Sequence, residues 1–376
     1  MTLPITANTA FRALFLADTP FLDVRAEAEF QRGRFPGSCN LPILNDPERE
    51  RVGTCYKREG QAAAVALGHD LVSGELRDAR IRGWADFVRS NPGAHLYCWR
   101  GGMRSQLAQQ WLAAAGVRVP RIEGGYKALR NFLLAEIDAC AAEQPLVLIG
   151  GRTGSAKTPL IRALASGIDL EHHANHRGSS FGRMPDGSPA QADFENVLAI
   201  DILRKRARLS GTPGTPLFLE DESRAIGAVH MPQALWLAMK AAPVALVDMP
   251  LAFRVDQILR EYVHQMTALY EARSPDTGFD DFATYLRDSL QRLARRLGAV
   301  RLDALRAALD DALATQRRSG DCEAHRAWIE RLLVEYYDPM YDYQLEKQQR
   351  QPLFRGDWDA VLAWARDYAV HAGRVS

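Results

Sequence analysis

The sequence predicts an α/β protein with two parallel-sheet domains followed by a helical region. Three observations predict it. Residues 1 to about 140 alternate short apolar runs with helical patterns, a new apolar run at 146–149 opens into a glycine-rich turn, and the pattern from residue 253 onward is almost wholly helical. A chain of 376 residues also exceeds the size at which one core usually stops growing. We therefore expect domains at 1–140 and 145–250 and a helical region at 251–376.

The composition is that of an ordinary globular protein, with 47% hydrophobic and 25% charged residues. The 47 basic and 46 acidic residues leave a formal charge of +1, so a nucleic-acid surface would have to come from local clustering. Apolar runs are far shorter than the roughly 20 residues that span a bilayer, and the N-terminus lacks a signal pattern. We therefore expect a cytoplasmic protein without a membrane partner.

The N-terminal domain has the strand and helix rhythm of a parallel sheet. Apolar runs at 21–24 and 95–97 are typical of short buried strands, and 105–115 has a helical pattern. In the second domain, 216–220 and 243–248 are further strand candidates, each following a loop with proline. Helices connecting parallel strands account for this order.

Cys98 is the best candidate for a nucleophile. The chain has five cysteines and no C-x-x-C pair, which argues against a disulfide framework and a zinc knuckle. Cys98 follows a strand and precedes a helix, so we expect its sulfur at a helix N-terminus, where backbone N–H groups favour an anion. Gly101 and Gly102 let the loop curl, and Arg100 and Arg104 add positive charge. These surroundings predict a reactive thiolate.

Residues 98–105 resemble the active-site loop of rhodanese domains. Segments 23–25 and 33–42 are similar to the N-terminal part of the same family. The loop also has the C-x5-R-[ST] spacing of cysteine phosphatases. A loop of this length suits a tetrahedral oxyanion or a large chalcogen group better than a single sulfur atom. A phosphatase therefore stays open as an interpretation.

A second loop, residues 151–158, has the pattern of a phosphate cradle. It lies between an apolar run and the helical run 160–165, the context that G-x-x-x-x-G-K-[ST] requires. Lys157 supplies charge and Thr158 is a candidate to hold Mg²⁺. Ala156 replaces the expected glycine, so the pattern predicts phosphate binding but not ATP hydrolysis. The predicted phosphate-binding residues are Gly151, Thr153, Gly154, Ser155, Ala156, Lys157 and Thr158.

Two other pairs are candidates for contacts with a substrate or a metal. Glu220 and Asp221 end a strand candidate and are suited to a metal contact, although a solvated acidic loop fits the pattern as well. His176 and Arg177 are candidates to bind phosphate or transfer a proton, although a loop histidine is more often structural. No residue is assigned with certainty as a metal ligand.

The combination of the two loops resembles the tRNA 2-selenouridine synthase family over most of the chain. Further similar segments are 124–127, 174–182, 220–227 and 336–341. The resemblance implies that geranyl diphosphate S-alkylates the wobble 2-thiouridine of a tRNA and that selenium from selenophosphate then replaces the geranylthio group. It implies that Cys98 is the essential cysteine, which either carries selenium or organises selenophosphate. We expect the diphosphate of the prenyl donor in the 151–158 loop.

The resemblance also implies contact with the tRNA anticodon region. Arginines between 292 and 331 could serve it, although composition favours a solvated, ion-paired face, and the tyrosines between 336 and 343 are expected in a core or interface. Two rival functions stay open. One is a persulfide sulfurtransferase that uses Cys98, with the phosphate loop serving activation, and the other is a nucleotide-regulated binding protein with a silent rhodanese domain. Intact Cys98, Arg100 and Arg104 count against the silent domain.

Overall fold

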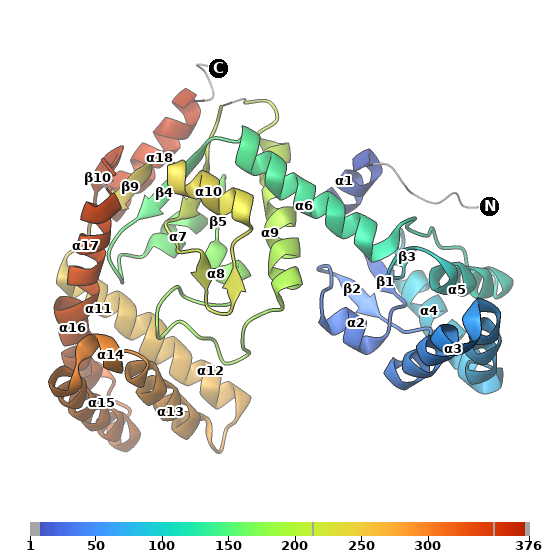
Figure 1. Cartoon of the computed structure of the whole chain (residues 1–376). Coiled ribbons are helices and arrows are strands. Elements are labelled where there is room, and N and C mark those ends of the chain that lie inside the picture. The colour runs from blue at the N-terminus through green and yellow to red at the C-terminus, as the bar shows by residue number, and fades with distance from the viewer. Residues whose placement is uncertain (1–7, 213, 349, 373–376) are drawn as a thin grey trace. The chain divides into compact units, whose positions relative to one another are not determined.

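The computed structural model describes residues 8–212, 214–348 and 350–372. The predicted α/β class is confirmed, because the chain forms two compact units that each contain a parallel sheet (Figure 1). The first unit contains the residues up to Ala139 together with Ala190–Arg206. The second contains Cys140–Pro189 and the residues from Ala207 onward. A segment from the middle of the chain therefore completes the N-terminal unit.

The first unit has a three-stranded parallel sheet in the order β2-β1-β3. Its strands are β1 (Phe21–Asp23), β2 (Ser38–Asn40) and β3 (His95–Tyr97). A parallel bridge between Leu96 and Arg121 continues the sheet beyond β3. The helices of this unit are α1 (Asn8–Leu16), α2 (Glu27–Gln31), α3 (Asp46–Leu71), α4 (Gly74–Ser90), α5 (Met103–Ala114), α6 (Gly125–Glu143) and α9 (Gln191–Arg208).

The core of the first unit lies between this sheet and its helices. Leu22 and Leu96 are fully buried on adjacent strands, and Trp84 of α4 packs in the same cluster. The indole Nε1 of Trp84 donates a hydrogen bond to the carbonyl of Leu41 at 2.8 Å, so the large ring is buried without an unsatisfied polar atom.

The second unit has a five-stranded sheet in the order β10-β9-β4-β6-β5, with all strands parallel. Its strands are β4 (Leu146–Gly150), β5 (Gly167–Ile168), β6 (Leu217–Glu220), β9 (Val244–Val247) and β10 (Phe354–Gly356). The central strand β4 is a continuous buried apolar run, as parallel strands covered on both faces are.

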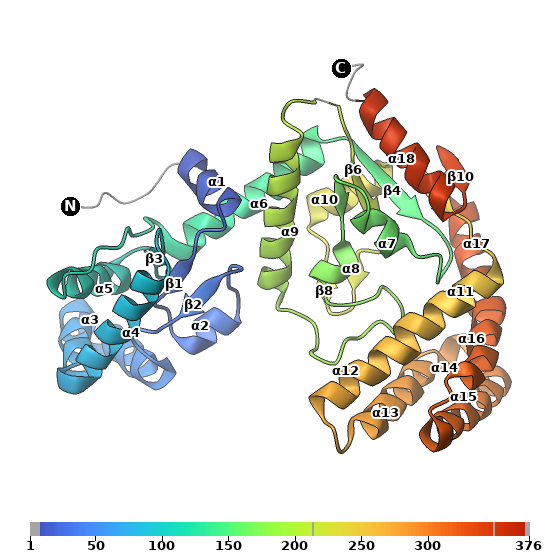
Figure 2. The same ribbon diagram turned by 180° about the vertical axis from the view of Figure 1, so that it is seen from behind.

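Short helices and a hairpin surround this sheet. They are α7 (Lys157–Arg162), α8 (Leu170–His173), the hairpin β7 (Ala225–Ile226) and β8 (Val229–His230), α10 (Gln233–Ala241) and α18 (Trp358–Ala372). Apolar residues of α7 and α18 share one buried cluster with the sheet, and both views show α18 beside β10 (Figures 1 and 2). Sequence patterns did not indicate β10, so the return of 354–372 to the sheet is a feature that only the structure shows.

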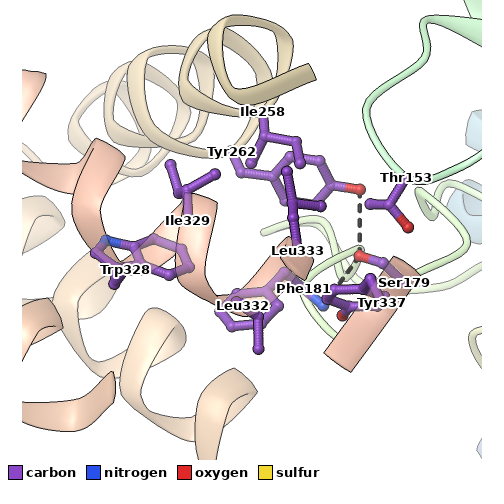
Figure 3. Close-up of a pocket in the computed structure, with 10 residues that line it drawn as sticks. All are labelled: Thr153, Ser179, Phe181, Ile258, Tyr262, Trp328, Ile329, Leu332, Leu333 and Tyr337. Atoms are coloured by element: carbon purple, nitrogen blue, oxygen red, sulfur yellow. Dashed lines mark hydrogen bonds between the residues drawn. The ribbon is translucent and has the colours of Figure 1, made fainter. Parts of the chain in front are cut away.

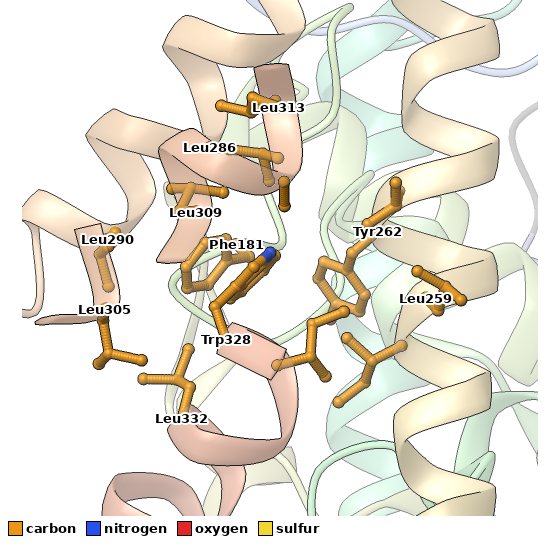
Figure 4. Packing of buried hydrophobic residues seen from close by; sticks show 14 of the residues in the cluster. Phe181, Leu259, Tyr262, Leu286, Leu290, Leu305, Leu309, Leu313, Trp328 and Leu332 are labelled. Carbon is orange, nitrogen blue, oxygen red and sulfur yellow. The ribbon is translucent and has the colours of Figure 1, made fainter. Parts of the chain in front are cut away.

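The remaining helices form a bundle with its own core, shown in Figure 4. Its elements are α11 (Leu251–Ile258), η1 (Leu259–His264), α12 (Gln265–Arg273), α13 (Gly278–Gln291), α14 (Ala294–Leu297), α15 (Ala299–Ser319), η2 (Glu323–His325), α16 (Arg326–Leu332), η3 (Leu333–Tyr337) and α17 (Asp338–Gln348). Phe181, from a loop outside the bundle, stacks on Trp328 with ring centroids 5.6 Å apart. The bundle core therefore reaches the loop that precedes α9.

Two turns of the bundle, η1 and η3, are π-helical. Such turns are rare and are frequently found at functional sites. Within the described ranges, no helix combines the length and apolar character that crossing a membrane requires.

His325 is fully buried in the bundle in a fixed neutral form. Its Nδ1 accepts a hydrogen bond from Trp328 Nε1 at 2.9 Å, which leaves the proton on Nε2 to donate to Gln316 Oε1 at 2.9 Å. Burial, followed by the charge of His264, lowers the pKa of His325 to about 4. Protonation of this ring therefore opposes folding.

Replacing His325 by Gln should reduce the acid sensitivity of the bundle. The folded pKa lies below the unfolded value of about 6.5, so the stability due to the neutral ring is present above pH 6.5 and is lost as the pH falls towards 4. We expect the wild-type unfolding free energy to fall, relative to His325→Gln, by up to about 1.4 kcal/mol per pH unit in this window. Urea unfolding at several pH values measures the difference, with the exposed His371→Gln as control; parallel pH profiles would contradict it.

Candidate functional site

Cys98 lies where the end of β3 meets the loop that leads into α5. The residue is 3% exposed, and its Sγ lies 3.2 Å from Ser105 Oγ. The Ser105 hydroxyl in turn contacts the Gly102 carbonyl at 3.0 Å. The sulfur therefore lies beside the first turn of α5, which begins at Met103. An anion bound in this loop would face the unsatisfied N–H groups of the first helical turn.

The segment at the start of α6 holds the cysteine loop through backbone hydrogen bonds. The N–H of Tyr126 donates to the Cys98 carbonyl at 2.9 Å, and the N–H of Lys127 donates to the Trp99 carbonyl at 3.0 Å. Gly125 has a φ of +57°, and a Cβ atom there would lie 2.2 Å from the Cys98 oxygen. Only glycine allows this approach.

A buried ion pair lies under the aromatic rings of the loop. Arg25 Nη2 contacts Asp23 Oδ2 at 2.6 Å, and both side chains are fully buried. The guanidinium also donates to the Gly33 carbonyl at 2.7 Å and lies 4.0 Å from the centre of the Tyr126 ring. Tyr126 stacks on Trp99 with centroids 5.4 Å apart. The Arg25 guanidinium also lies 5.7 Å from the centre of the Trp99 ring, so the buried pair lies against both aromatic rings of the loop.

The structure places the two predicted arginines of the loop in different surroundings. Arg104 forms two hydrogen bonds to the carboxylate of Glu29, at 2.6 and 3.1 Å. Although burial would lower it, this pairing holds the pKa of Arg104 above its usual value, and the charge of Cys98 adds to the effect. Arg100 is exposed. Arg104 therefore supplies a fixed charge beside the sulfur, and Arg100 faces solvent.

The 151–158 loop adopts the backbone conformations of a phosphate cradle. Gly151 and Gly154 have φ values of +151° and +84°, and Lys157 Nζ donates to the Gly151 carbonyl at 3.0 Å. Ala156 adopts the left-handed conformation, with φ 58° and ψ 41°, at the N-cap of α7. Its carbonyl accepts a hydrogen bond from Trp358 Nε1 at 3.0 Å. An alanine therefore occupies a conformation that suits glycine.

Arginines and aspartates clamp this loop to the bundle. Arg254 is buried and forms two hydrogen bonds to the carboxylate of Asp338, at 2.6 and 2.7 Å, while its Nη1 also reaches the Thr153 carbonyl at 3.4 Å. Arg152 forms a second bidentate pair, with Asp342, at 2.8 to 3.1 Å. The 336–341 segment noted in the sequence therefore positions the phosphate loop.

Two half-buried glutamates lie beside the start of α7. Thr158 Oγ1 donates to Glu171 Oε2 at 2.8 Å. A Cβ atom on Gly178 would lie 2.7 Å from a Glu171 oxygen and 2.6 Å from a Glu222 oxygen, so glycine is needed between the carboxyl groups. Removal from water, together with the charge of Glu171, raises the pKa of Glu222 to about 8 despite the opposing charge of Lys157. The pair therefore retains a proton at neutral pH.

The predicted acidic pair has protein partners. Glu220 is fully buried, and its Oε2 accepts a hydrogen bond from the N–H of Leu170 at 2.9 Å. Asp221 pairs with Arg350 at 3.3 Å. No group of three or more His, Cys, Asp or Glu side chains suited to a metal occurs among the residues described. Thr158 and Glu171 instead offer adjacent oxygens, which fit Mg²⁺ when phosphate oxygens and water complete its shell.

His176 and Arg177 line a polar pocket of about 330 Å³ together with Thr158 and Glu171. Burial, followed by the charge of Arg292, lowers the pKa of His176, so the ring is neutral at physiological pH. Both predicted residues therefore line the same pocket as Thr158, the last residue of the 151–158 loop.

Most arginines proposed for RNA contact have partners within the bundle. Arg292 donates to the Ser180 carbonyl at 2.9 Å and Arg296 to the Tyr336 hydroxyl at 2.8 Å. Five others form ion pairs: Arg301 and Arg331 with Glu335, Arg306 with Asp303, Arg317 with Asp280, and Arg326 with Asp256 and Glu323. Tyr336 and Tyr337 are buried, as expected for core residues, whereas Tyr343 is 62% exposed and does not belong to the core. The ion-paired face is therefore the better description of these groups.

Comparison with known proteins agrees with the two-loop architecture. A family described as the tRNA 2-selenouridine synthase AAA domain matches residues 144–372, and one described as a rhodanese-like domain matches 9–131. A Bordetella petrii protein named tRNA 2-selenouridine synthase is 51% identical over 95% of this chain and 95% of its own. The chain belongs to the tRNA 2-selenouridine synthase family. Proteins of the same name from Cupriavidus necator and Photobacterium profundum are 49% and 47% identical, each over 98% of this chain and 100% of their own.

Several residues that support the two loops of this synthase-family chain could not be identified from the sequence. Glu171 was not singled out, and the pairing of Arg254 with Asp338 was not foreseen. The buried pair of Asp23 and Arg25 lies in a segment noted only for its family resemblance. A charged residue next to a buried strand, as in 21–25, is the signal that could have identified that pair.

Replacing Gly125 by Ala should displace the cysteine loop. The added Cβ would collide with the Cys98 carbonyl, in addition to the left-handed strain of about 1–2 kcal/mol. Gly116→Ala is a matched control, because Gly116 has a φ of +77° and open space around it. We expect Gly125→Ala to be less stable than the control by at least about 2 kcal/mol in thermal unfolding. Equal losses would show that the contact is not tight.

Replacing Ala156 by Gly should stabilise the second unit. Glycine relieves the left-handed strain, and its extra freedom in the unfolded chain offsets part of the gain, which leaves about 0.5–1 kcal/mol. Ala163, a right-handed residue at the end of α7, should show the opposite sign, with a loss of up to about 1 kcal/mol in Ala163→Gly. Urea unfolding midpoints measure both changes. A destabilised Ala156→Gly variant would contradict the argument.

Proposed function

We propose that this protein converts the wobble 2-thiouridine of tRNA into 2-selenouridine in the cytoplasm, as a transferase with two successive reactions. The observation that carries the proposal is the full-length similarity to proteins named tRNA 2-selenouridine synthase, together with intact Cys98 and Lys157 in loops of suitable geometry. The tRNA substrate would present its anticodon region, because the base must be splayed out of a loop to react.

The first proposed reaction alkylates the sulfur with geranyl diphosphate. The thiocarbonyl sulfur attacks C1 of the donor, the C–O bond breaks, diphosphate leaves and the uracil N3 proton is lost. Lys157 and the N–H groups of the 151–158 loop would bind the diphosphate and stabilise its charge as it leaves. Thr158 and Glu171 would hold Mg²⁺, which supplies further charge neutralisation on the diphosphate.

The second proposed reaction replaces the geranylthio group with selenium from selenophosphate. Selenium attacks C2 of the base, and geranylthiol leaves as the C–S bond breaks. The alkylated sulfur is the better leaving group, because it departs as a thiol rather than as a sulfide dianion. The phosphoryl group carried in on selenium is then transferred to water, which releases phosphate.

Cys98 and its loop would organise selenophosphate in this second reaction. The start of α5 and the charge of Arg104 provide an anion site at the sulfur. A covalent S–Se bond between Cys98 and the selenium of selenophosphate would require oxidation by two electrons. Neither co-substrate provides an oxidant, so we favour the organising role over a selenylated cysteine.

The persulfide sulfurtransferase is the rival function, and the cysteine loop alone would fit it. Its weakness is the elaborate support of the phosphate loop, where two bidentate arginine pairs and Trp358 fix the backbone. A sulfurtransferase would use this loop for activation, and the alanine at position 156 does not favour ATP hydrolysis there. A silent rhodanese domain would likewise leave the paired Arg104 and Glu29 unexplained.

Mass spectrometry of nucleosides from 2-thiouridine tRNA, incubated with the protein and both co-substrates, tests the proposal. We expect 2-selenouridine from the intact protein, accumulated S-geranyl-2-thiouridine from Cys98→Ala, and a loss of geranylation by about 100-fold or more from Lys157→Ala. Cys55→Ala and the exposed Lys240→Ala are matched controls that should behave as wild type. If the intact protein leaves 2-thiouridine unchanged, the proposal fails and the sulfurtransferase is the next function to assay.

A further inference from the structure

An apolar pocket opens beside the phosphate loop, at Thr153. Its walls come from the loop at 179–181, from α11 and η1, and from α16 and η3 (Figure 3). Apolar side chains, among them Phe181, Trp328 and Leu333, form most of its surface. The wall also touches the loop itself, because a Cβ atom on Gly154 would lie 3.1 Å from Ile258 Cδ1. A ligand held in the phosphate loop can therefore extend directly into this pocket.

Two of the polar side chains in the pocket wall, Ser179 and Tyr262, are already engaged, whereas the buried Tyr337 hydroxyl has no hydrogen-bond partner among the described residues. Ser179 Oγ donates to the Tyr262 hydroxyl at 3.2 Å and accepts from the N–H of Phe181 at 3.1 Å. The Tyr262 hydroxyl donates to the Arg177 carbonyl at 3.1 Å. A nucleobase buried here would find these groups occupied and would lose its hydrogen bonds with water. The wall therefore suits a hydrocarbon and disfavours a nucleotide.

We infer that this pocket holds the hydrocarbon chain of a short prenyl diphosphate whose diphosphate occupies the 151–158 loop. The inference rests on the proposed function, which supplies geranyl diphosphate as the donor. It adds the place where the hydrocarbon chain of that donor binds. An anion site continuous with an apolar wall matches the two ends of such a molecule.

The pocket must widen to admit the chain. Its volume is about 20 Å³, little more than one water molecule needs. Two of its walls contain the π-helical turns η1 and η3, which contribute Tyr262 on one side and Leu333 and Tyr337 on the other. These turns break the regular helical ladder at the place where the wall has to move. Leu332 and Leu333 line the pocket, so we expect the size of their side chains to affect how long a chain can enter.

Calorimetric binding of geranyl diphosphate and of inorganic diphosphate to the full-length protein tests the inference. Burial of even part of the chain should make geranyl diphosphate bind at least about 100-fold more tightly than diphosphate. Leu333→Trp should reduce this ratio to within about threefold and leave diphosphate binding unchanged. Val334→Trp, a neighbour on the same turn that is 49% exposed, is the matched control and should keep the wild-type ratio.

Equal affinities in the wild type, or an unchanged ratio in Leu333→Trp, would overturn the inference. If Leu333→Trp does not fold, Leu332→Ala provides the test of the inference. The larger cavity should raise the affinity for farnesyl diphosphate relative to geranyl diphosphate by about tenfold. An unchanged ratio would overturn the inference. Binding separates this inference from the proposed function. If geranyl diphosphate binds in a way that depends on the pocket but 2-thiouridine tRNA is not alkylated, only the proposed function is refuted. If 2-thiouridine tRNA is alkylated equally by the wild type and by both variants, only the inference about the pocket is refuted.

Discussion

A loop that offers its N–H groups to an anion cannot use them to hold itself, so its shape must be fixed from outside. Both reactive loops of this protein obey that constraint. The N–H groups of Tyr126 and Lys127 hold the carbonyl side of the cysteine loop, and Arg254 and Trp358 hold carbonyls of the phosphate loop. In each case the support binds C=O groups, although the N–H of Ser155 donates within its own loop to the Arg152 carbonyl at 3.2 Å. The fold of each unit positions the groups that form these hydrogen bonds.

Burying charged groups costs free energy, and the protein does so repeatedly next to its loops. The pair of Asp23 and Arg25 is fully buried, and Arg254 is nearly so. Such pairs add little net stability compared with apolar packing, but removing one partner leaves an uncompensated charge at a cost of about 3–5 kcal/mol. Their effect is to allow one arrangement of the loop backbone. We interpret these buried pairs as interactions that fix the position of the loop backbone and add little to the free energy of unfolding.

The parts of each candidate loop that are contiguous in sequence were predictable. Cys98 and the 151–158 loop each join a strand to a helix, so their type and place follow from local pattern. The clamp of Arg254 on Asp338 joins residues 84 apart, and such pairing leaves no periodic trace. Strand β10 has three residues and acquires its conformation by pairing with β9 rather than from local preference. Tertiary contacts determine this ion pair and this strand, and local sequence patterns do not predict them.

The sheet of the second unit ends, in chain order, with β10. Until residues 354–356 leave the ribosome, β9 is an edge strand with unpaired N–H and C=O groups, and the Trp358 bond to the phosphate loop is missing. The first unit likewise waits for α9, which is synthesised after β4 and β5 of the other unit. Neither unit can therefore be completed independently during translation. The apolar residues that α18 covers in the folded unit therefore stay uncovered in a nascent chain until residues 354–372 have been synthesised.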